Sequence, residues 1–303
     1  MHLCQAGAAK MIQRISTITQ EQVAAFLKPR PRDSHKGLFG AVAVIGGASG
    51  MVGAPLLAAR AALKLGAGCV HVGLLADNAP MVDLLQPELM LHCAQDALRI
   101  LPHPNPLPAG EGAVCALAIG CGMGTSIAAQ KILHQALKTD AALVLDADAL
   151  NLLARHTDLQ DDLRARKTAS IITPHPGEAS RLLGTSTKQM QAARTEAAQE
   201  LAEKLHCSVV LKGADSVCVT RDGKTYLNKT GNPGMSAPGM GDVLTGMIAA
   251  FIAQGLGADR ALLLAVHLHG AAGDALAQQG IATGMTATDV TEWSRWLLNQ
   301  WVC

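Results

Sequence analysis

The feature that most constrains the fold is a repeated alternation of short β-rich runs with helical runs. Six runs have the composition of buried strands, at residues 41–45, 69–74, 114–119, 143–145, 171–173 and 209–211. The first continues through a glycine turn at 46–50 into a helix expected over about 55–65, and each of the last four meets a Gly, Asp or Pro turn. Such strand–helix units predict an α/β fold whose mostly parallel sheet is covered on both faces.

Two segments interrupt this alternation. The β-rich runs 216–220 and 224–228 flank Arg221-Asp-Gly223, which predicts an antiparallel β-hairpin at a sheet edge. Residues 101–110 hold four prolines in alternation, which excludes a helix or a central strand and predicts an exposed connecting loop.

Composition limits the classes of protein that this chain can represent. The 303 residues are 49% hydrophobic and 16% charged, which permits a sizeable core, and without an internal repeat or linker we expect one domain. A net charge of +1 and only 2% aromatic residues argue against a nucleic-acid partner, and no apolar stretch is long enough to cross a membrane.

The cysteines and the amino terminus both predict a reducing compartment. None of the eight cysteines forms a CxxC pair, and several sit in apolar runs, so we expect small buried thiols and no zinc site. Residues 1–10 lack the apolar core of a secretion signal. The predicted location is therefore the cytoplasm.

The most informative segment is residues 232–254. Its second half carries apolar side chains at the spacing of a core-facing helix, at Leu244, Met247, Ile248, Phe251 and Ile252. This pattern places Gly239-Met-Gly-Asp242 at the amino end of that helix. The N–H groups of Gly239, Met240 and Gly241, together with the helix dipole, are expected to form an anion hole.

Asp242 then lies in the first turn of the helix, and two roles are open for it. An aspartate that follows a glycine at a helix start is often only an N-cap. An aspartate beside an anion hole can also accept the proton of a hydroxyl that attacks a phosphate. A cap does not need ten glycine-rich residues before it, so the sequence favours the catalytic role.

Other turns follow predicted strands and are expected at the same edge of the sheet. They lie at residues 46–55, 120–124, 173–178 and 212–216. The third aims His175 at this edge, and the last could hold a nucleotide through backbone groups and one cation, Lys212. The glycines at 120–124 lack the dinucleotide-fold spacing, and no GxxxxGK[ST] motif is present.

Two weaker candidates keep alternatives open. Asp146 and Asp148 follow a strand and could hold Mg²⁺ through water, or they could be ordinary acids at a helix start. His267 and His269 are two residues apart on an apparent helix and do not face each other, so we expect packed or hydrogen-bonded side chains and no metal pair.

Taken together, these motifs closely resemble the ADP-dependent NAD(P)H-hydrate dehydratases of the ribokinase-like superfamily. The resemblance rests on the motifs at 36–37, 46–68, 87–90, 120–124, 145–151, 173–178, 211–214, 228–246 and 284–290. It implies a three-layer α/β/α fold with a doubly wound sheet over residues 36–303, preceded by an extension at 1–35.

The resemblance also implies a reaction. ADP, or ATP in other members, phosphorylates the hydroxyl of the S-epimer of NADHX or NADPHX, the hydrated forms of NADH and NADPH. Phosphate then leaves, which restores the reduced cofactor and releases AMP when ADP is used. Mg²⁺ is the implied metal cofactor. A homotetramer and a separate NAD(P)H-hydrate epimerase are the implied partners, because about 35 residues before the motifs are too few for an epimerase domain.

Individual residues carry over from the family motifs. The resemblance implies contacts with the hydrated cofactor from Ala54, Gly122, His175 and Asp242. It implies an adenine-nucleotide site at Lys212, Gly213, Ala214, Asp215, Ser216 and Gly241. Three positions depart from the family pattern: Cys121 stands where proline is common, and Pro238 and Met240 replace small residues.

One alternative activity shares the expected fold. An ATP-dependent kinase for a small alcohol, such as a vitamin precursor, would use the same phosphate site but release a stable phosphorylated product. The segments 173–178 and 232–235 favour the dehydratase.

Overall fold

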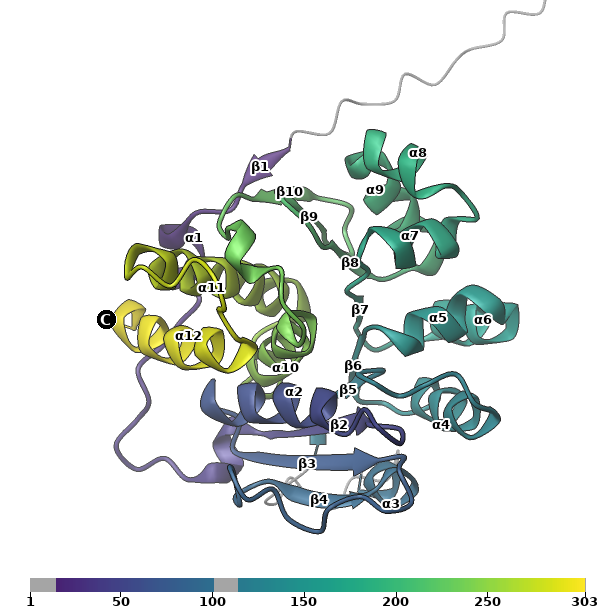
Figure 1. The fold of residues 1–303 in the computed structure, drawn as a ribbon, viewed down its shortest axis with the longest axis horizontal. Helices are drawn as coiled ribbons and strands as arrows, with labels where there is room; N and C mark the ends of the chain where they lie inside the picture. Colours follow the sequence, from purple (N-terminus) through teal and green to yellow (C-terminus); the bar gives the residue numbers. More distant parts are fainter. Residues whose placement is uncertain (1–14, 101–113, 303) are drawn as a thin grey trace, which may run out of the picture.

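A computed structural model describes residues 15–100 and 114–302, and in it a single sheet organises the chain (Figure 1). Its strands are β1 (Ser16–Thr17), β2 (Ala41–Gly46), β3 (Cys69–Leu74), β4 (Met90–Cys93), β5 (Val114–Ile119), β6 (Ala142–Leu145), β7 (Ser170–Ile172), β8 (Ser208–Leu211), β9 (Ser216–Val219) and β10 (Thr225–Asn228). Their order is β1-β10-β9-β8-β7-β6-β5-β2-β3-β4. The strands from β8 to β4 in this order are all parallel, as the alternating sequence pattern predicts.

Helices cover both faces of the sheet (Figure 1). One face carries α1 (Gln20–Ala24), α2 (Gly53–Lys64), α10 (Met240–Ala253), α11 (Ala258–Gln278) and α12 (Ala287–Trp301). The other carries α3 (Ala94–Arg99), α4 (Ile127–Leu137), α5 (Asp148–Arg155), α6 (Thr157–Ala165), α7 (Pro176–Leu183), α8 (Thr187–Ala192) and α9 (Arg194–Leu205). Two short 3₁₀ turns, η1 (Lys36–Phe39) and η2 (Pro233–Met235), complete the elements.

The strands are buried on both faces, and β2 shows how one strand feeds two cores. Val42 and Val44 face the core under α2 and α10, whereas Ala43 and Ile45 face the core under α3 and α4. Successive side chains point to opposite faces of a strand, so a continuous apolar run is what a doubly covered sheet requires. The three-layer α/β/α architecture is confirmed.

The predicted strands and the hairpin are confirmed with small shifts at their ends, and further edge elements appear. The hairpin of β9 and β10 is antiparallel, but the two-residue β1 pairs with β10 and forms the outermost edge. At the opposite edge lies β4, which the sequence analysis did not identify. Within the predicted extension, Ile18 and Val23 are buried in the core. The proline-rich segment 101–110 lies outside the described residues.

Most of the described cysteines have the burial that the sequence predicts. Cys121, Cys207 and Cys218 are buried with free thiols, as expected, while Cys93 is exposed. Burial raises the pKa of Cys207 and that of Cys218 to about 12, so both stay protonated. Within the described ranges, no helix is both long and apolar enough to cross a bilayer.

Helix α10 is more deeply buried than its predicted apolar stripe implied. Every residue from Val243 to Ala253 is buried, including Thr245 and Gly246 outside the stripe. A Cβ added to Gly246 would lie 2.0 Å from the carbonyl oxygen of Ala58 on α2. The absence of a side chain there lets the two helices approach closely, which positions the amino end of α10.

We predict that Gly246→Ala destabilises the protein by about 1–3 kcal/mol, because the new methyl group must push α10 away from α2. Urea unfolding would measure this change. The matched control is Gly257→Ala, since Gly257 has a φ of −57° and no heavy atom within 4 Å of an added Cβ. Equal stability of the two variants would show that the close helix contact is not needed.

Candidate active site

Five turns lie together at the carboxyl end of the sheet, where the parallel strands finish; we call this end the site edge. The strands β2, β5, β6, β7 and β8 are parallel, so their carboxyl ends lie on the same side. The turns that follow them contain the glycine, aspartate, histidine and lysine residues singled out in the sequence. Open α/β sheets bind ligands at this edge, because helix starts and loop amides converge there.

The turns after β2 and β5 form a joined backbone unit. The N–H of Gly47 donates to the carbonyl of Cys121 over 3.0 Å, and the N–H of Ala48 donates to the carbonyl of Gly122 over 2.7 Å. A Cβ on Gly46 would lie 2.1 Å from the Cys121 carbonyl oxygen. A side chain at Gly46 would therefore separate the two turns.

A buried ion pair stands at the centre of the edge. The ammonium of Lys212, which follows β8, lies 2.7 Å from Oδ1 of Asp146, which follows β6. The hydroxyl of Thr245 on α10 donates to the other carboxylate oxygen over 3.0 Å. Burial alone would lower the pKa of Lys212, yet Asp146 and Glu178 raise it above its usual value. Both partners of the pair are therefore charged at neutral pH.

Asp242 points toward this centre and is not an N-cap. Gly239, in the left-handed conformation at φ 88°, is the capping residue, and no side chain caps α10. Asp242 is the third residue of the helix. Its carboxylate, the thiol of Cys121 and the carboxylate of Asp146 have ligand atoms within 4.8 Å of one another. The alternative that Asp242 serves only as a cap is wrong.

Its surroundings make Asp242 a stronger base than an exposed aspartate. Its pKa is raised to about 6, chiefly by burial and also by the charge of Asp146. A hydrogen bond from the Cys121 thiol and the charge of Lys212 oppose this rise. The thiol is itself held protonated, because burial and Asp242 raise the pKa of Cys121 well above its usual value. A group with such a pKa is ionised at neutral pH and can still accept a proton.

The start of α10 offers backbone donors beside the ion pair. Helical geometry leaves the N–H groups of Met240, Gly241 and Asp242 without acceptors inside the helix. A Cβ on Gly241 would lie 3.1 Å from the Lys212 ammonium and 3.3 Å from Asp146 Oδ2. The predicted anion hole thus lies next to Lys212, the lysine that is predicted to bind the nucleotide. The Met240 side chain is buried in the core, so its bulk lies away from this opening.

Both histidines of α11 have structural partners. His267 Nδ1 lies 3.2 Å from the side-chain oxygen of Asn228. His269 hydrogen bonds to the backbone of Met240. Burial lowers the pKa of His269 to about 4, which keeps its ring neutral. The expectation that these residues are packed or hydrogen-bonded is confirmed, and His269 helps to hold the first residue of α10.

Three of the predicted substrate contacts lie around the glycine turns. A Cβ on Gly122 would lie 3.1 Å from the Cβ of Ala54, so these two positions adjoin. His175 caps α7: its Nδ1 accepts the N–H of Gly177 at 2.9 Å, which leaves the ring proton on Nε2. Burial lowers the pKa of His175, and the nearby Lys212 lowers it further. The neutral imidazole is therefore half exposed at this end of the sheet, and its Nε2 lies 3.3 Å from Oε1 of Glu178.

Glu178 is a second buried carboxyl group beside the ion pair. Its carboxylate accepts the backbone N–H of His175 over 2.7 Å. Burial raises the pKa of Glu178 to about 7, and the attraction of Lys212 only partly offsets this. Glu178 fixes the turn that carries His175 and can exchange a proton near neutral pH.

The predicted nucleotide turn at residues 212–216 has a defined shape. The N–H of Lys212 donates to the carbonyl of Pro174 over 2.9 Å, and the hydroxyl of Ser216 donates to the carbonyl of Gly213 over 2.9 Å. Gly213 has a φ of 142°, and a Cβ there would meet the guanidinium of Arg194 at 2.5 Å. The turn lies beside the His175 turn, and its lysine side chain reaches inward to Asp146 at the centre.

The two aspartates proposed for Mg²⁺ have separate tasks. Asp146 binds Lys212 and Thr245, whereas Asp148 accepts the N–H of Gly124 over 2.8 Å and so holds the turn after β5. The cluster that contains Asp146 also includes a thiol, which Mg²⁺ does not favour. In the described part of the chain, these residues do not form a carboxylate pair suited to Mg²⁺.

Sequence reasoning assigned no role to three residues of this centre. Thr245 is a fully buried polar residue in an otherwise apolar helix, three positions after Asp242, and that spacing was a usable signal. Glu178 lies within a recognised motif, but only the folded chain shows that it is buried. Cys121 was noted as a departure from the family, with no indication of its contact with Asp242.

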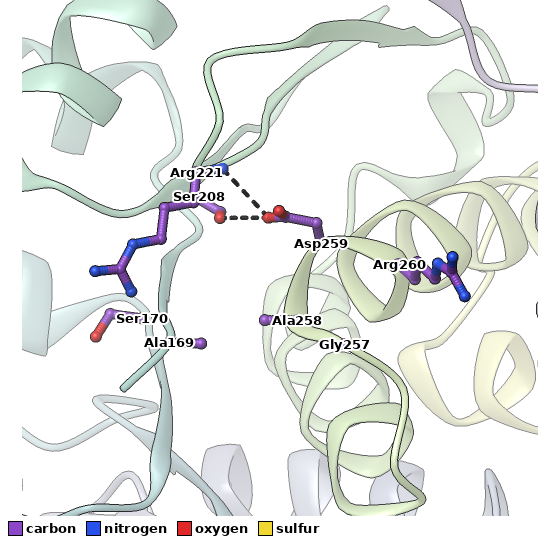
Figure 2. A pocket seen from close by; sticks show the side chains of 8 residues that line it. All are labelled: Ala169, Ser170, Ser208, Arg221, Gly257, Ala258, Asp259 and Arg260. Atoms are coloured by element: carbon purple, nitrogen blue, oxygen red, sulfur yellow. Dashed lines mark hydrogen bonds between the residues drawn. The ribbon is translucent and has the colours of Figure 1, made fainter. Parts of the chain in front are cut away.

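Two cavities of about 460 Å³ each are found near the sheet ends, and the first lies away from Asp242. It sits where β7 and β8 begin, between Ser170, Ser208, Arg221 and the start of α11. Figure 2 shows the Asp259 carboxylate accepting the hydroxyl of Ser208 and the N–H of Arg221. The Asp259 carboxylate therefore already has hydrogen-bond donors. This cavity lies at the amino ends of β7 and β8, opposite to the candidate active site.

The doubly wound sheet with helices on both faces is a ribokinase-like fold, which a solved ribokinase-like protein of Enterococcus faecalis shares with a TM-score of 0.81 at 24% identity. A family model described as NAD(P)H-hydrate dehydratase matches residues 42–295. The chain belongs to this family.

Individual relatives agree with this assignment. The chain is 42% identical to the ADP-dependent (S)-NAD(P)H-hydrate dehydratase of Neisseria meningitidis, with 90% of each chain covered. It is 41% identical to a bifunctional NAD(P)H-hydrate repair enzyme of Coxiella burnetii over 91% of this chain, but it spans only 54% of that protein. The solved ADP/ATP-dependent NAD(P)H-hydrate dehydratase of Bacillus subtilis, co-crystallised with ATP and Mg²⁺, has a TM-score of 0.82 at 29% identity and covers 95% of this chain and 99% of its own.

We predict that Asp146→Asn destabilises the protein by about 3 kcal/mol, because it leaves the buried Lys212 ammonium without a counter-charge. The effect falls at the lower end of the range for buried pairs, since the lysine side chain is 21% exposed. Urea unfolding at pH 7 measures the change. Asp222→Asn, which breaks the exposed pair with Lys224, should unfold like the wild type. Similar behaviour of the two variants would contradict a central role for the Asp146–Lys212 pair.

Proposed function

We propose that this protein uses ADP to dehydrate the S-epimer of NADHX and NADPHX, which regenerates NADH and NADPH. One observation carries the proposal: the raised-pKa carboxylate of Asp242 lies beside the donor-rich start of α10 and the charged Lys212. A base next to an anion site is what a phosphoryl transfer to a hydroxyl needs. Membership of the dehydratase family supports the choice of substrate.

In the first step, the hydrate hydroxyl attacks the terminal phosphorus of ADP while Asp242 accepts its proton. The bond between this phosphorus and the bridging oxygen breaks, and AMP leaves. The N–H groups of Met240 and Gly241 and the Lys212 ammonium would hold the transferring phosphoryl group. Positioned backbone donors of this kind stabilise a transition state by about 3–4 kcal/mol each.

In the second step, the phosphate leaves the ring carbon. The lone pair of the neighbouring ring nitrogen forms a double bond to that carbon, the carbon–oxygen bond breaks, and inorganic phosphate is released. Loss of a proton from the adjacent ring carbon then restores the dihydronicotinamide. The contacts proposed for Ala54, Gly122 and His175 would keep the ring next to Asp242 during both steps.

In this proposal, ADP and its Mg²⁺ lie on the β8 side of the Asp146–Lys212 ion pair, and the hydrated cofactor lies on the β2 side. The residues proposed for ADP are Lys212, Gly213, Ala214, Asp215, Ser216 and Gly241. Mg²⁺ usually keeps several waters and binds through substrate phosphates, and when bound in this way it neutralises their charge. This mode of binding agrees with an edge where Asp146 and Asp148 are already engaged by protein groups.

The competing proposal of a small-alcohol kinase shares the first step, and the product distinguishes the two. A kinase would leave a stable phosphate ester, whereas a dehydratase releases inorganic phosphate and restores the near-ultraviolet absorbance of the reduced nicotinamide. Homotetramer formation and a cytoplasmic location stay predictions, and light scattering of the purified protein would test the first.

We predict that Asp242→Asn retains ADP binding and loses about 100-fold or more in turnover of the hydrate, because it removes the base but keeps the shape of the helix start. The assay mixes protein, NADHX and ADP and follows the recovery of nicotinamide absorbance. Asp222→Asn, remote on the hairpin turn, is the control and should retain full activity. A loss below tenfold would mean that Asp242 is not the base, and an inactive wild type with both ADP and ATP would overturn the dehydratase assignment.

We predict a loss of activity in acid that reports on Asp242. The base must be ionised, and burial raises its pKa to about 6, so kcat/KM should be level above about pH 7 and fall about tenfold per pH unit well below pH 6. The small residual activity of Asp242→Asn should lack this fall. A wild-type midpoint near pH 4 would contradict the buried environment of the carboxylate.

The same profile tests the Cys121 thiol. Its hydrogen bond lowers the pKa of Asp242, so Cys121→Ala should move the midpoint upward by roughly half a unit. Cys121→Ser keeps a donor and should stay near the wild-type midpoint. Equal midpoints for the alanine and wild-type proteins would show that the thiol does not contact the base.

A further inference from the structure

A second cavity opens beside the glycine turns. It has a volume of about 460 Å³ and lies between the first residues of α3 and α4, above the ends of β3 and β4. Its walls include the apolar side chains of Leu74, Met123 and Ile132. Polar groups also line it, among them Asp77, Gln95 and Lys131.

This cavity lies at the point where the order of the strands reverses. From β2 the chain proceeds outward to β3 and β4 on one side, and to β5, β6 and β7 on the other. A crevice forms between strands whose connections diverge in this way. Ala48 from the turn after β2 and Met123 from the turn after β5 both line the cavity.

The cavity shares two turns with the proposed substrate site. Ala48 donates its N–H to the carbonyl of Gly122, and Gly122 adjoins Ala54. The proposed contacts with the hydrated ring therefore form one side of the two joined turns, and residues of the same turns line the cavity. A molecule longer than the ring could therefore reach both positions.

The proposed substrate is such a molecule. The strand order indicates in which direction it extends from its ring. Asp146 follows β6, and Asp242 on α10 lies beside it and beside Cys121, which follows β5, whereas the turn proposed for ADP follows β8. With ADP on the β8 side, the rest of the dinucleotide extends toward β2 and β3. The cavity lies on that side.

We propose that this cavity receives the adenosine end of the hydrated dinucleotide and that Lys131 faces its phosphate groups. This inference rests on the proposed function. Apolar walls with a few polar groups suit a base and a ribose. Within the described residues, no carboxylate lies at ion-pair distance from the Lys131 ammonium, so its charge is available to a ligand.

The charge at the cavity also concerns substrate choice. NADPHX carries one phosphate more than NADHX, on the adenosine ribose, so a cation in this cavity favours NADPHX. Asp77 is the opposing group, because a carboxylate accepts hydrogen bonds from the free ribose hydroxyls of NADHX and repels the extra phosphate. Lys131 and Asp77 together would set the preference between the two substrates.

The test compares a dinucleotide hydrate with a mononucleotide hydrate that lacks the adenosine half. Ala128 lies at the cavity, is exposed and is in the first turn of α4, so Ala128→Trp fills the space with little strain. We expect this variant to lose about tenfold or more in kcat/KM for NADPHX. Its kcat/KM for hydrated reduced nicotinamide mononucleotide and its KM for ADP should stay at wild-type values.

A surface variant tests the charge without altering the packing. Lys131→Ala should lower kcat/KM for NADPHX about fivefold and for NADHX less, which is the size of effect of a partly exposed charge. Lys138→Ala, an exposed lysine at the end of the same helix, is the matched control and should change neither value.

The outcomes separate this inference from the proposed function. One outcome is an active wild type together with Ala128→Trp and Lys131→Ala variants that show wild-type kcat/KM for both the dinucleotide and the mononucleotide hydrates. That result would overturn the cavity assignment alone. Equal losses on the dinucleotide and the mononucleotide hydrates would overturn it too, since the damage would then lie at the ring site. A wild type that turns over no hydrate would overturn the proposed function and this inference together.

Discussion

The candidate site depends on one buried interaction, the ion pair between Asp146 and Lys212. It ties the end of β6 to the end of β8, and the Thr245 hydroxyl adds α10 to the same carboxylate. Three segments far apart in sequence are thereby held at fixed positions. The pair also places a permanent positive charge beside Gly241, where backbone donors of α10 converge. A buried pair of this kind is costly to form and costly to break, so it specifies one arrangement of these segments.

The same pair sets the protonation of its neighbours. Burial raises the pKa of Asp242 to about 6 and that of Glu178 to about 7, while Lys212 limits both shifts. Without the lysine, both carboxyl groups would hold their protons more firmly and neither would be a useful base at neutral pH. The electrostatic environment that sets the pKa of Asp242 is therefore also the one that holds the fold at this end of the sheet.

The sheet brings the turns of the candidate site together around this centre. Because β2, β5, β6, β7 and β8 are parallel, the turns that follow these five strands lie at the same end of the sheet. The reversal of strand order between β2 and β5 opens that edge in two directions, toward the turn at 212–216 and toward the cavity beside Ala48. This arrangement suits the proposed reaction between two nucleotides, in which each would present only its reactive end to Asp242. The close backbone contacts at Gly46 and Gly246 keep the edge compact enough for this.

The sequence by itself determined the α/β class, the order and approximate positions of the main strands, the hairpin and the start of α10, because local periodicity and glycine placement encode them. It also singled out Asp242, Lys212 and His175. Only the tertiary structure decided that Asp146 pairs with Lys212 while Asp148 turns to Gly124, that Asp242 is no cap, and that Cys121 and Thr245 face the centre. Those relations join residues from different strands, and pKa values depend on burial. Neither contact across strands nor burial of a polar side chain leaves a local pattern in the chain, so folding alone brings them about.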